Sequence, residues 1–265
     1  MDSAARRSAW NDKGFFIVRG LVSPAEAKAV EAEVIDRIRA HPPGDHPGET
    51  LYAAGPNYAI FPEKAPSPTA VNPEDSVAKV FNCHAEGRAR RTAARADIVD
   101  KVAEILGPDL DCFQSQFIFK NPGVIGQPWH QDSYYFRFDT QPQVGVWVAL
   151  SLATLENGCL WVLSGSHKGP IREHEPDRRP AANRAYMEIT SQDDAAREPA
   201  LMAPGDVLFF HSYLMHMSTD NVANERRAAM VYHYARAGTR AETPEVAETL
   251  RHVNRWIPVR RREAA

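Results

Sequence analysis

The hydrophobic pattern of this chain changes its period near residue 112. Over 24–40, apolar residues recur every three or four positions, which is typical of an amphipathic helix. Over 113–120 and 144–152 the side chains instead alternate with a period of two, which is typical of strands. Helices first and strands later predict a mainly β fold, an antiparallel β-barrel or sandwich with an α-helical N-terminal layer.

The N-terminal part carries explicit signals for where its elements begin and end. Ser23 can cap the helix over 24–40, and Glu26 can reach back to complete a capping box. Asp97 is expected to cap a second helix, which Gly107 and the following proline end. The apolar run over 15–22 is expected to form a short buried strand.

The strand expected over 144–152 has two different faces. One face is apolar throughout, from Val144 to Leu152, and the other carries small residues around the single large side chain of Trp147. A pocket wall needs such a surface. Two polar, proline-bearing stretches, 42–76 and 166–200, are long enough to be lids over a pocket, although a plain surface loop is an equal alternative for the first.

Composition limits the class of protein. The 265 residues carry a net charge of −3, so neither nucleic acid nor an anionic membrane surface is an expected partner. The three cysteines, at 83, 112 and 159, are an odd number without metal-type spacing, which predicts a reducing compartment. No apolar run is long enough to span a bilayer, and the first residues resemble no signal peptide, so we expect a cytoplasmic protein.

The motif His130-Gln131-Asp132 is the first candidate for a metal site. If the stretch is extended, the imidazole and the carboxylate point to the same face. A second histidine would complete the two-histidine, one-carboxylate set that holds a non-haem Fe(II) and leaves positions open. His211 and His216 compete for that place, and the polar surroundings of His216 favour it over His211, which shares a strand face with apolar residues.

An arginine follows His216 at a distance of eleven residues. An iron oxygenase that uses 2-oxoglutarate must hold the far carboxylate of that cosubstrate, and a guanidinium group can do so with two parallel hydrogen bonds. Arg226 and Arg227 are adjacent, so in a strand they face opposite ways. Spacing and alternation favour Arg227 for the pocket, and Arg226 is expected to be solvated.

The motifs of the chain, taken in order, resemble the phytanoyl-CoA dioxygenase family, especially its domain-containing branch. The resemblance covers about residues 14–236 and rests on 118–123 (IFKNPG), His130-X-Asp132, 156–168, Pro204-Gly205-Asp206, His216-X-Ser218, Asn221 and Arg227. It implies a single domain over 1–265 with a double-stranded β-helix, or jelly roll. It also implies an Fe(II)- and 2-oxoglutarate-dependent dioxygenase that consumes O2, with ascorbate as a supporting reductant.

The resemblance also assigns roles to residues. It implies that His130, Asp132 and His216 hold the iron and that Arg227, helped by Ser218, binds the distal carboxylate of 2-oxoglutarate. It places Gln116, Trp147 and, by a looser match, Lys79 around the cosubstrate. Where many relatives have proline before Gly-Ser-His, this chain has Ser164, a change that is expected to affect a turn and not the chemistry.

Several outcomes remain open at this stage. The favoured function is hydroxylation of an unactivated C–H bond in a small molecule or acyl thioester, with 2-oxoglutarate converted to succinate and CO2. The same enzyme could instead perform desaturation, epoxidation, demethylation or cyclisation in a natural-product pathway. A jelly-roll protein that binds metal and ligand without turnover is the alternative from another class. The chain could be a monomer or a homodimer.

The remaining histidines and aromatic residues have weaker signals. His167 is expected to hold a turn, and His233 could face the pocket or lie in the core. His84 has no partner that the sequence reveals. Tyr134, Tyr135 and Phe136, which follow the metal motif, could line the substrate side or pack inside the barrel.

Overall fold

The computed structural model describes residues 1–183 and 185–262. Its helices are α1 (Ser3–Lys13), α2 (Pro24–Ala40), α3 (Gly87–Ala93), α4 (Ala96–Leu106), α5 (Asp132–Tyr135) and α6 (Pro244–Leu250). Short 3-10 turns cover Pro43–Asp45, Pro73–Ser76, Cys83–Ala85 and Ser166–Lys168. Its strands are β1 (Phe15–Val18), β2 (Tyr52–Ala54), β3 (Tyr58–Pro62), β4 (Val77–Phe81), β5 (Leu110–Lys120), β6 (Val144–Ala149), β7 (Leu160–Leu163), β8 (Glu175–Pro176), β9 (Met187–Glu188), β10 (Arg197–Ala200), β11 (Val207–His211), β12 (His216–Ser218), β13 (Arg227–Arg236) and β14 (Ile257–Arg260).

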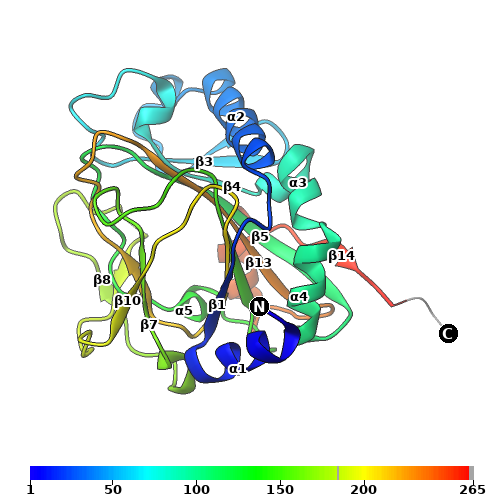
Figure 1. The fold of residues 1–265 in the computed structure, drawn as a ribbon. Helices are drawn as coiled ribbons and strands as arrows, with labels where there is room; N and C mark the ends of the chain where they lie inside the picture. Colours follow the sequence, from blue (N-terminus) through cyan, green and yellow to red (C-terminus); the bar gives the residue numbers. More distant parts are fainter. Residues whose placement is uncertain (184, 263–265) are drawn as a thin grey trace.

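The strands form a mainly β structure with antiparallel sheets, as the alternating pattern predicts. The large sheet has the order β1-β11-β6-β13-β5-β4-β3-β2, and β14 pairs with β5 outside that order. A second sheet has the order β10-β7-β12, and β8 pairs with β9 in a third. Figure 1 shows β7 and β10 on one side of β5 and β13, with α3 and α4 on the other side.

The two faces of β6 serve two different cores. Val144, Val146 and Val148 belong to the cluster that also contains the buried faces of α2 and α4. Trp147 lies in a second cluster, which joins the large sheet to residues of β7 and β10. The predicted difference between the two faces is therefore present. Leu152, however, is 50% exposed, because β6 ends at Ala149 and the chain has left the sheet by that point.

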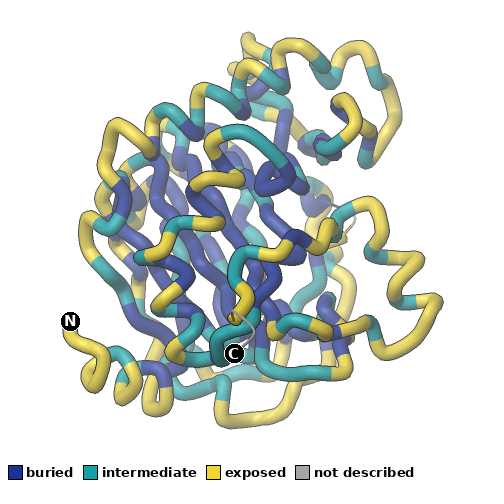
Figure 2. The backbone as a smooth tube through the Cα atoms, turned by 90° about the vertical axis from the view of Figure 1, so that its right-hand side faces the viewer, coloured by how far each residue is buried: buried dark blue, intermediate teal, exposed yellow. Residues whose placement is uncertain are grey.

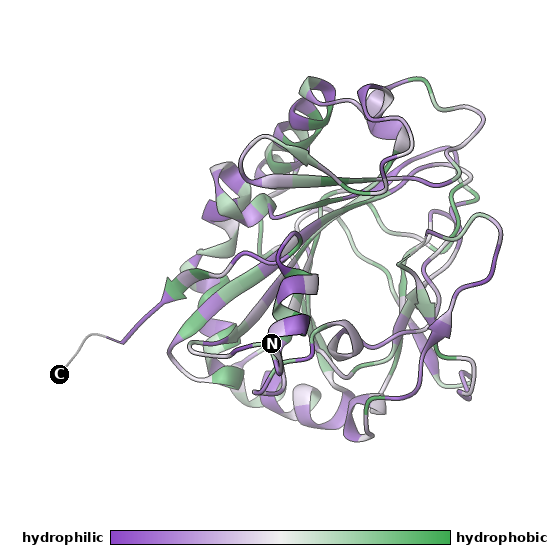
Figure 3. Ribbon diagram, turned by 180° about the vertical axis from the view of Figure 1, so that it is seen from behind, coloured by the Kyte–Doolittle hydropathy of each residue, from purple (hydrophilic) through white to green (hydrophobic). Residues whose placement is uncertain are grey.

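The helices place their apolar residues against the large sheet. The buried positions of α2 recur at helical spacing, at Ala27, Val30, Val34 and Ile38, and pack in the same cluster as β6. In Figure 3 the helices carry hydrophilic and hydrophobic residues side by side, as helices with one buried face should. Figure 2 shows the buried strands enclosed by more exposed helices and loops.

The sequence signals predicted some element boundaries correctly and others wrongly. Ser23 caps α2 and forms the predicted capping box with Glu26. Asp97 does not cap α4: that helix begins at Ala96, and Asp97 lies in its first turn, where its carboxylate is paired with Arg95. The strand expected over 15–22 is also shorter, because β1 ends at Val18 and the chain turns through Gly20, whose φ is +60°.

In the described part of the chain, no helix is both long enough and apolar enough to cross a membrane.

Candidate active site

The two histidines of the predicted metal set are paired through their backbones. His130 and His216 lie directly opposite each other in an isolated antiparallel bridge, in which each amide N donates to the other carbonyl O over 3.0 Å. Side chains of directly opposite residues lie on the same face of an antiparallel pair. The two imidazole rings consequently have centroids only 4.2 Å apart.

Asp132 completes this cluster from the first position of α5. The chain is extended at Gln131, as expected, but turns into the short helix at Asp132 instead of continuing as a strand. The Oδ1 atom of Asp132 lies 3.8 Å from Nε2 of His130 and 3.7 Å from Nε2 of His216. All three residues are buried, and their potential ligand atoms lie within 4.8 Å of one another.

The backbone selects the tautomer of both histidines. Nδ1 of His130 lies 2.8 Å from the carbonyl of Pro128, and Nδ1 of His216 lies 3.0 Å from the carbonyl of Leu214. A carbonyl only accepts, so each Nδ1 carries the proton and each Nε2 keeps a free lone pair towards Asp132. Burial, and then the neighbouring His216, hold the pKa of His130 well below its usual range, which keeps the ring neutral.

Asp132 is a buried carboxylate without a hydrogen-bond partner for its Oδ2 atom among the described residues. The closest cationic candidate is Nδ1 of His233, at 3.7 Å, but burial lowers the pKa of His233 to about 4. A buried, unpaired carboxylate is costly unless a cation binds it. Two imidazole lone pairs beside that carboxylate therefore fit a divalent metal ion.

A cavity of about 400 Å³ opens beside the three residues. Both predicted lids contribute to its wall, the first through Phe61 and Glu63 and the second through Ala185 and Tyr186. The stretch 42–76 therefore contributes to the cavity wall, and its role as a lid stays a prediction. The other predicted site residues that line this cavity are Lys79, Gln116, Tyr135, Phe136, Trp147, Ser218, Arg227 and His233.

Arg227 enters the cavity as a buried cation. Its Nε and Nη2 atoms donate to the carbonyl of Gly158 over 3.2 and 3.0 Å, and its guanidinium group lies 5.6 Å from the ring centroid of Trp147. Its Nη1 atom has no partner among the described residues. Burial lowers the pKa of Arg227 to about 10, so the group still carries its charge at neutral pH.

Arg226 points to the opposite face, as the alternation predicts, but it is not solvated. Its side chain is half-buried, donates to Asn121 over 2.7 Å and forms an ion pair with Asp75. The sequence could not reveal this pair, because Asp75 lies in a 3-10 turn that is about 150 residues away.

Lys79 and Gln116 are held by other polar side chains of the cavity wall. Lys79 donates from Nζ to Oε1 of Gln127 over 3.0 Å, and burial lowers its pKa to about 8. Gln116 donates from Nε2 to Oε1 of Gln114 over 2.6 Å. Both side chains can be redirected towards a ligand without a backbone movement, since each is held by a single side-chain hydrogen bond.

His211 lies away from this site. It shares the face of β11 with Val207 and Phe209, and its ring packs at 5.3 Å from Trp10 of α1. Its Nδ1 atom accepts from the amide of Tyr213 over 2.9 Å. His167 packs beside it, with ring centroids 5.2 Å apart. The structure thus separates His211 from His216.

Known proteins resemble this chain in sequence over most of its length. The sequence model of the family described as phytanoyl-CoA dioxygenase (PhyH) matches residues 10–229. The peroxisomal phytanoyl-CoA dioxygenase of Rattus norvegicus is 31% identical over 241 residues, which cover 88% of this chain and 68% of that protein. This chain belongs to the phytanoyl-CoA dioxygenase family.

Other family members and solved structures extend the comparison. Phytanoyl-CoA dioxygenase domain-containing protein 1 of Danio rerio is 28% identical over 89% of this chain and 91% of its own. The non-heme monooxygenase ThoJ has the same fold, with a TM-score of 0.68 at 24% identity over 99% of this chain and 85% of its own. The epimerase SnoN was solved in complex with Fe3+, alpha ketoglutarate and nogalamycin RO. It has a TM-score of 0.65 at 20% identity, and the match covers 91% of this chain and 86% of SnoN.

Lys120 and Glu63 are among the cavity residues that were not predicted from the sequence. The family resemblance placed Gln116 beside the cosubstrate, and Lys120 lies on the same face of β5, so alternation along that strand is a signal that could have identified Lys120. Glu63 follows β3 in the first lid, where no periodic pattern exists. It is only 8% exposed, and burial raises its pKa.

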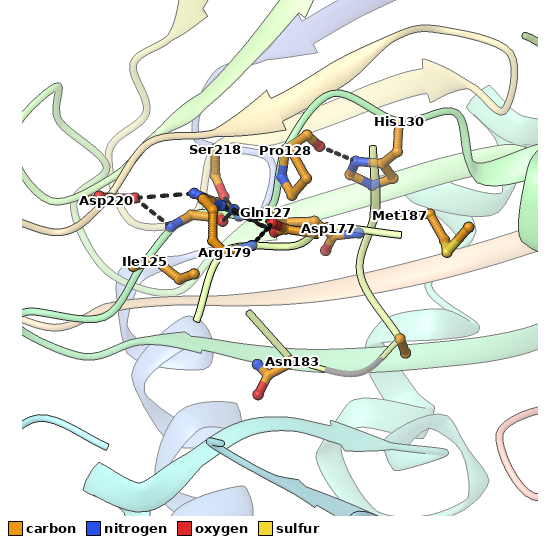
Figure 4. A network of polar contacts seen from close by, with 12 residues as sticks. Ile125, Gln127, Pro128, His130, Asp177, Arg179, Asn183, Met187, Ser218 and Asp220 are labelled. Carbon is orange, nitrogen blue, oxygen red and sulfur yellow. Dashed lines mark hydrogen bonds and ion pairs between the residues drawn. The ribbon is translucent and has the colours of Figure 1, made fainter. Parts of the chain in front are cut away.

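A polar network joins the second lid to the segment that leads to His130 (Figure 4). Arg179 is paired with Asp177 over 2.7 Å and donates from Nη2 to the carbonyl of Gly126 over 2.7 Å. The amide of Gly126 in turn donates to Asp220 over 2.7 Å. The lid is thereby fixed next to β12, which carries His216 and Ser218.

Proposed function

We propose that this chain is an Fe(II)- and 2-oxoglutarate-dependent dioxygenase that hydroxylates an unactivated C–H bond of a small molecule or acyl thioester. The observation that carries the proposal is the buried cluster of two tautomer-locked imidazoles and one unpartnered carboxylate beside a cavity of about 400 Å³. We further propose that the sheets form a double-stranded β-helix within one domain. The family, and the solved neighbour SnoN with its bound Fe3+ and alpha ketoglutarate, support this proposal.

In this proposal His130, Asp132 and His216 hold Fe(II). The bound iron, with O2 and 2-oxoglutarate, supplies an oxidant for the substrate and yields succinate and CO2. The carbonyls of Pro128 and Leu214 keep the two Nε2 lone pairs directed at the metal. Burial of the three ligands excludes bulk water, which protects the substrate from competing reactions.

The cosubstrate would lie between the metal ligands and β13. Arg227 has a free Nη1 atom for its distal carboxylate, and Ser218 lies in the same cavity. Trp147 packs beneath the guanidinium group, while Lys79 and Gln116 line the wall. The side chains of Phe61, Tyr135 and Phe136 leave an apolar space for the substrate.

The test measures succinate and oxidised product together, from a substrate panel with Fe(II), 2-oxoglutarate, O2 and ascorbate. The product structure distinguishes hydroxylation from desaturation, epoxidation, demethylation or cyclisation. Asp132→Ala and His216→Ala should each lower metal affinity and reduce turnover by orders of magnitude, because each removes one of three ligands. His211→Ala is the matched control and should keep metal binding.

Circular dichroism checks that each variant remains folded. A folded Asp132→Ala variant with the wild-type turnover would contradict the proposed metal site. Loss of metal from His211→Ala alone would move the ligand role to that residue. A wild-type protein that binds metal and 2-oxoglutarate but never forms succinate would be a binding protein without turnover.

A further inference from the structure

Two buried basic side chains face each other across neighbouring strands of the large sheet. Lys120 of β5 is the direct cross-strand partner of Arg227 of β13. Their exposed fractions are only 4% and 1%, and both side chains line the cavity of the proposed active site. Like charges directly opposite each other in a sheet destabilise it, and burial increases that cost.

Among the described residues, no acidic side chain forms an ion pair with Lys120 or Arg227, although the charges of Glu63 and Asp220 act on Lys120 from farther away. Neither Lys120 nor Arg227 has a carboxylate within 4.0 Å in the described part of the chain. Burial, followed by the charge of Arg227, holds the pKa of Lys120 well below its usual range. A bound anion would relieve both effects, because it replaces the water that each cation has lost.

The hydrogen bonds around Ser218 leave one donor free. Its Oγ atom accepts from Nζ of Lys120 and from the amide of Gln127, each over 3.1 Å. A hydroxyl group has two acceptor lone pairs and one proton, so these two contacts occupy the lone pairs and leave the O–H to donate. Figure 4 shows Ser218 joined to Gln127 in this way.

Lys120 itself also has a donor to spare. Its ammonium group has three N–H bonds, of which one is directed to Ser218 and one to the carbonyl of Ile125 over 3.0 Å. Together with the unpartnered Nη1 atom of Arg227, the cavity offers three kinds of donor. These are an ammonium, a hydroxyl and a guanidinium group, and all three residues line the same cavity.

We propose that Lys120 is a positioning residue for the distal carboxylate of the 2-oxo acid cosubstrate. It supplies a second positive charge beside Arg227, and it turns Ser218 into a hydrogen-bond donor by occupying one lone pair of its oxygen. The proposal rests on the proposed function, because it assumes that a 2-oxo dicarboxylate occupies this cavity. It accounts for a buried lysine opposite a buried arginine, which packing alone does not.

The test compares two ligands that differ only at the proposed contact. 2-Oxoglutarate and 2-oxopentanoate share a five-carbon 2-oxo acid chain, but 2-oxopentanoate lacks the distal carboxylate. Calorimetry with Ni(II)-loaded protein measures both affinities without turnover. In Lys120→Met, 2-oxoglutarate should bind at least tenfold more weakly, while the affinity for 2-oxopentanoate should change by less than about threefold.

A merely structural lysine gives a different pattern. If Lys120 only holds the backbone near Ile125, then Lys120→Met should lower the affinities for both ligands by the same factor. That result overturns the proposal. An unchanged preference for 2-oxoglutarate overturns it as well. Lys28→Met, which removes an exposed lysine from α2, is the control and should bind both ligands as the wild type does.

The link through Ser218 has its own measurement. In a Ser218→Ala background, Lys120→Met should cost less 2-oxoglutarate affinity than it does in the wild type, because the hydroxyl that Lys120 orients is already gone. If the two substitutions lower the affinity for 2-oxoglutarate by strictly additive free energies, Lys120 does not orient Ser218. If Lys120→Met does not fold, Lys120→Gln removes the same charge and carries the same expectations. Failure of the wild type to bind either 2-oxo acid would instead overturn the proposed function itself.

Discussion

At the scale of single residues, the site depends on carbonyl groups that fix imidazole tautomers. His130 and His216 each place Nδ1 against the carbonyl of the residue two positions earlier. This local arrangement needs only backbone carbonyls and no further side chain. It directs both Nε2 atoms at Asp132. A histidine that is fixed in this way is a prepared ligand, since neither its tautomer nor its ring orientation has to change on binding.

His84 shows the opposite use of a buried histidine, as part of the scaffold. Its Nδ1 atom lies 2.9 Å from Oγ of Ser115, and its Nε2 atom lies 2.7 Å from the carbonyl of Arg255. These contacts tie the turn at Cys83–Ala85 to β5 and to the segment before β14. Burial lowers the pKa of His84 from 6.5 to about 4, so the folded protein holds the ring neutral.

This shift predicts a pH dependence of stability. Between about pH 6.5 and pH 4 the unfolded chain binds a proton that folded His84 does not, so the free energy of unfolding falls as the pH falls. The slope from this group reaches at most about 1.4 kcal/mol per pH unit. His84→Gln should be destabilised by about 1–3 kcal/mol at pH 7.5, and its difference from the wild type should shrink towards pH 4.5.

Urea denaturation at several pH values measures this difference. Other buried histidines titrate in both proteins, so their contribution cancels in the comparison. A difference between His84→Gln and the wild type that stays constant with pH would show that His84 does not titrate as described.

At the scale of elements, strand register brings a glycine under an aromatic ring. Gly145 of β6 pairs directly with Phe210 of β11, and a Cβ atom at Gly145 would lie 2.2 Å from the Phe210 ring. Phe210 in turn packs edge-on against His216, with centroids 5.1 Å apart. The strands therefore support a proposed metal ligand from behind, through a ring that needs the space above a glycine.

Gly145→Ala should displace the Phe210 ring and disturb His216. We expect a loss of about 1–3 kcal/mol in the free energy of unfolding, as for other overpacked cores, with weaker metal binding. Gly44→Ala is the matched control, because a Cβ atom there meets nothing within 4 Å. Thermal unfolding and metal titration of both variants test this, and equal stability of the two would contradict the packing argument.

At the scale of the whole molecule, the two predicted lids contact each other beside the cavity. Nδ2 of Asn183 donates to Oε2 of Glu63 over 3.1 Å, and Oδ1 of Asn183 accepts from the amide of Lys64 over 2.9 Å. One amide side chain of the second lid thus binds both a side chain and the backbone of the first. We therefore expect this contact and the Arg179 network to hold the second lid in place.

Asn183→Ala should therefore loosen the second lid without unfolding the large sheet. We expect trypsin to cleave within 166–200 several times faster, while the midpoint of urea unfolding changes little, because local opening needs less free energy than global unfolding. Exposed Glu173 lies in the same lid, and Glu173→Ala is the control. Equal cleavage rates in the two variants would show that the Glu63–Asn183 contact does not hold the lid.

The sequence by itself determined the features that depend on neighbours along the chain. The change of period near residue 112 predicted helices and strands, and the capping box of Ser23 predicted where α2 begins. Alternation predicted that Trp147 and Arg227 share the cavity side of their strands. Such features follow from the direction of successive side chains, which a strand or helix sets over a few residues.

Only the tertiary structure decided which distant residues meet. The bridge between His130 and His216, the ladder that sets Lys120 against Arg227, and the contact of Glu63 with Asn183 all join segments far apart in the chain. The same cause explains the wrong prediction for Arg226, which finds Asp75 across the fold. Strand pairing and loop packing depend on the free energy of the complete core. A local sequence pattern therefore does not determine which distant segments meet.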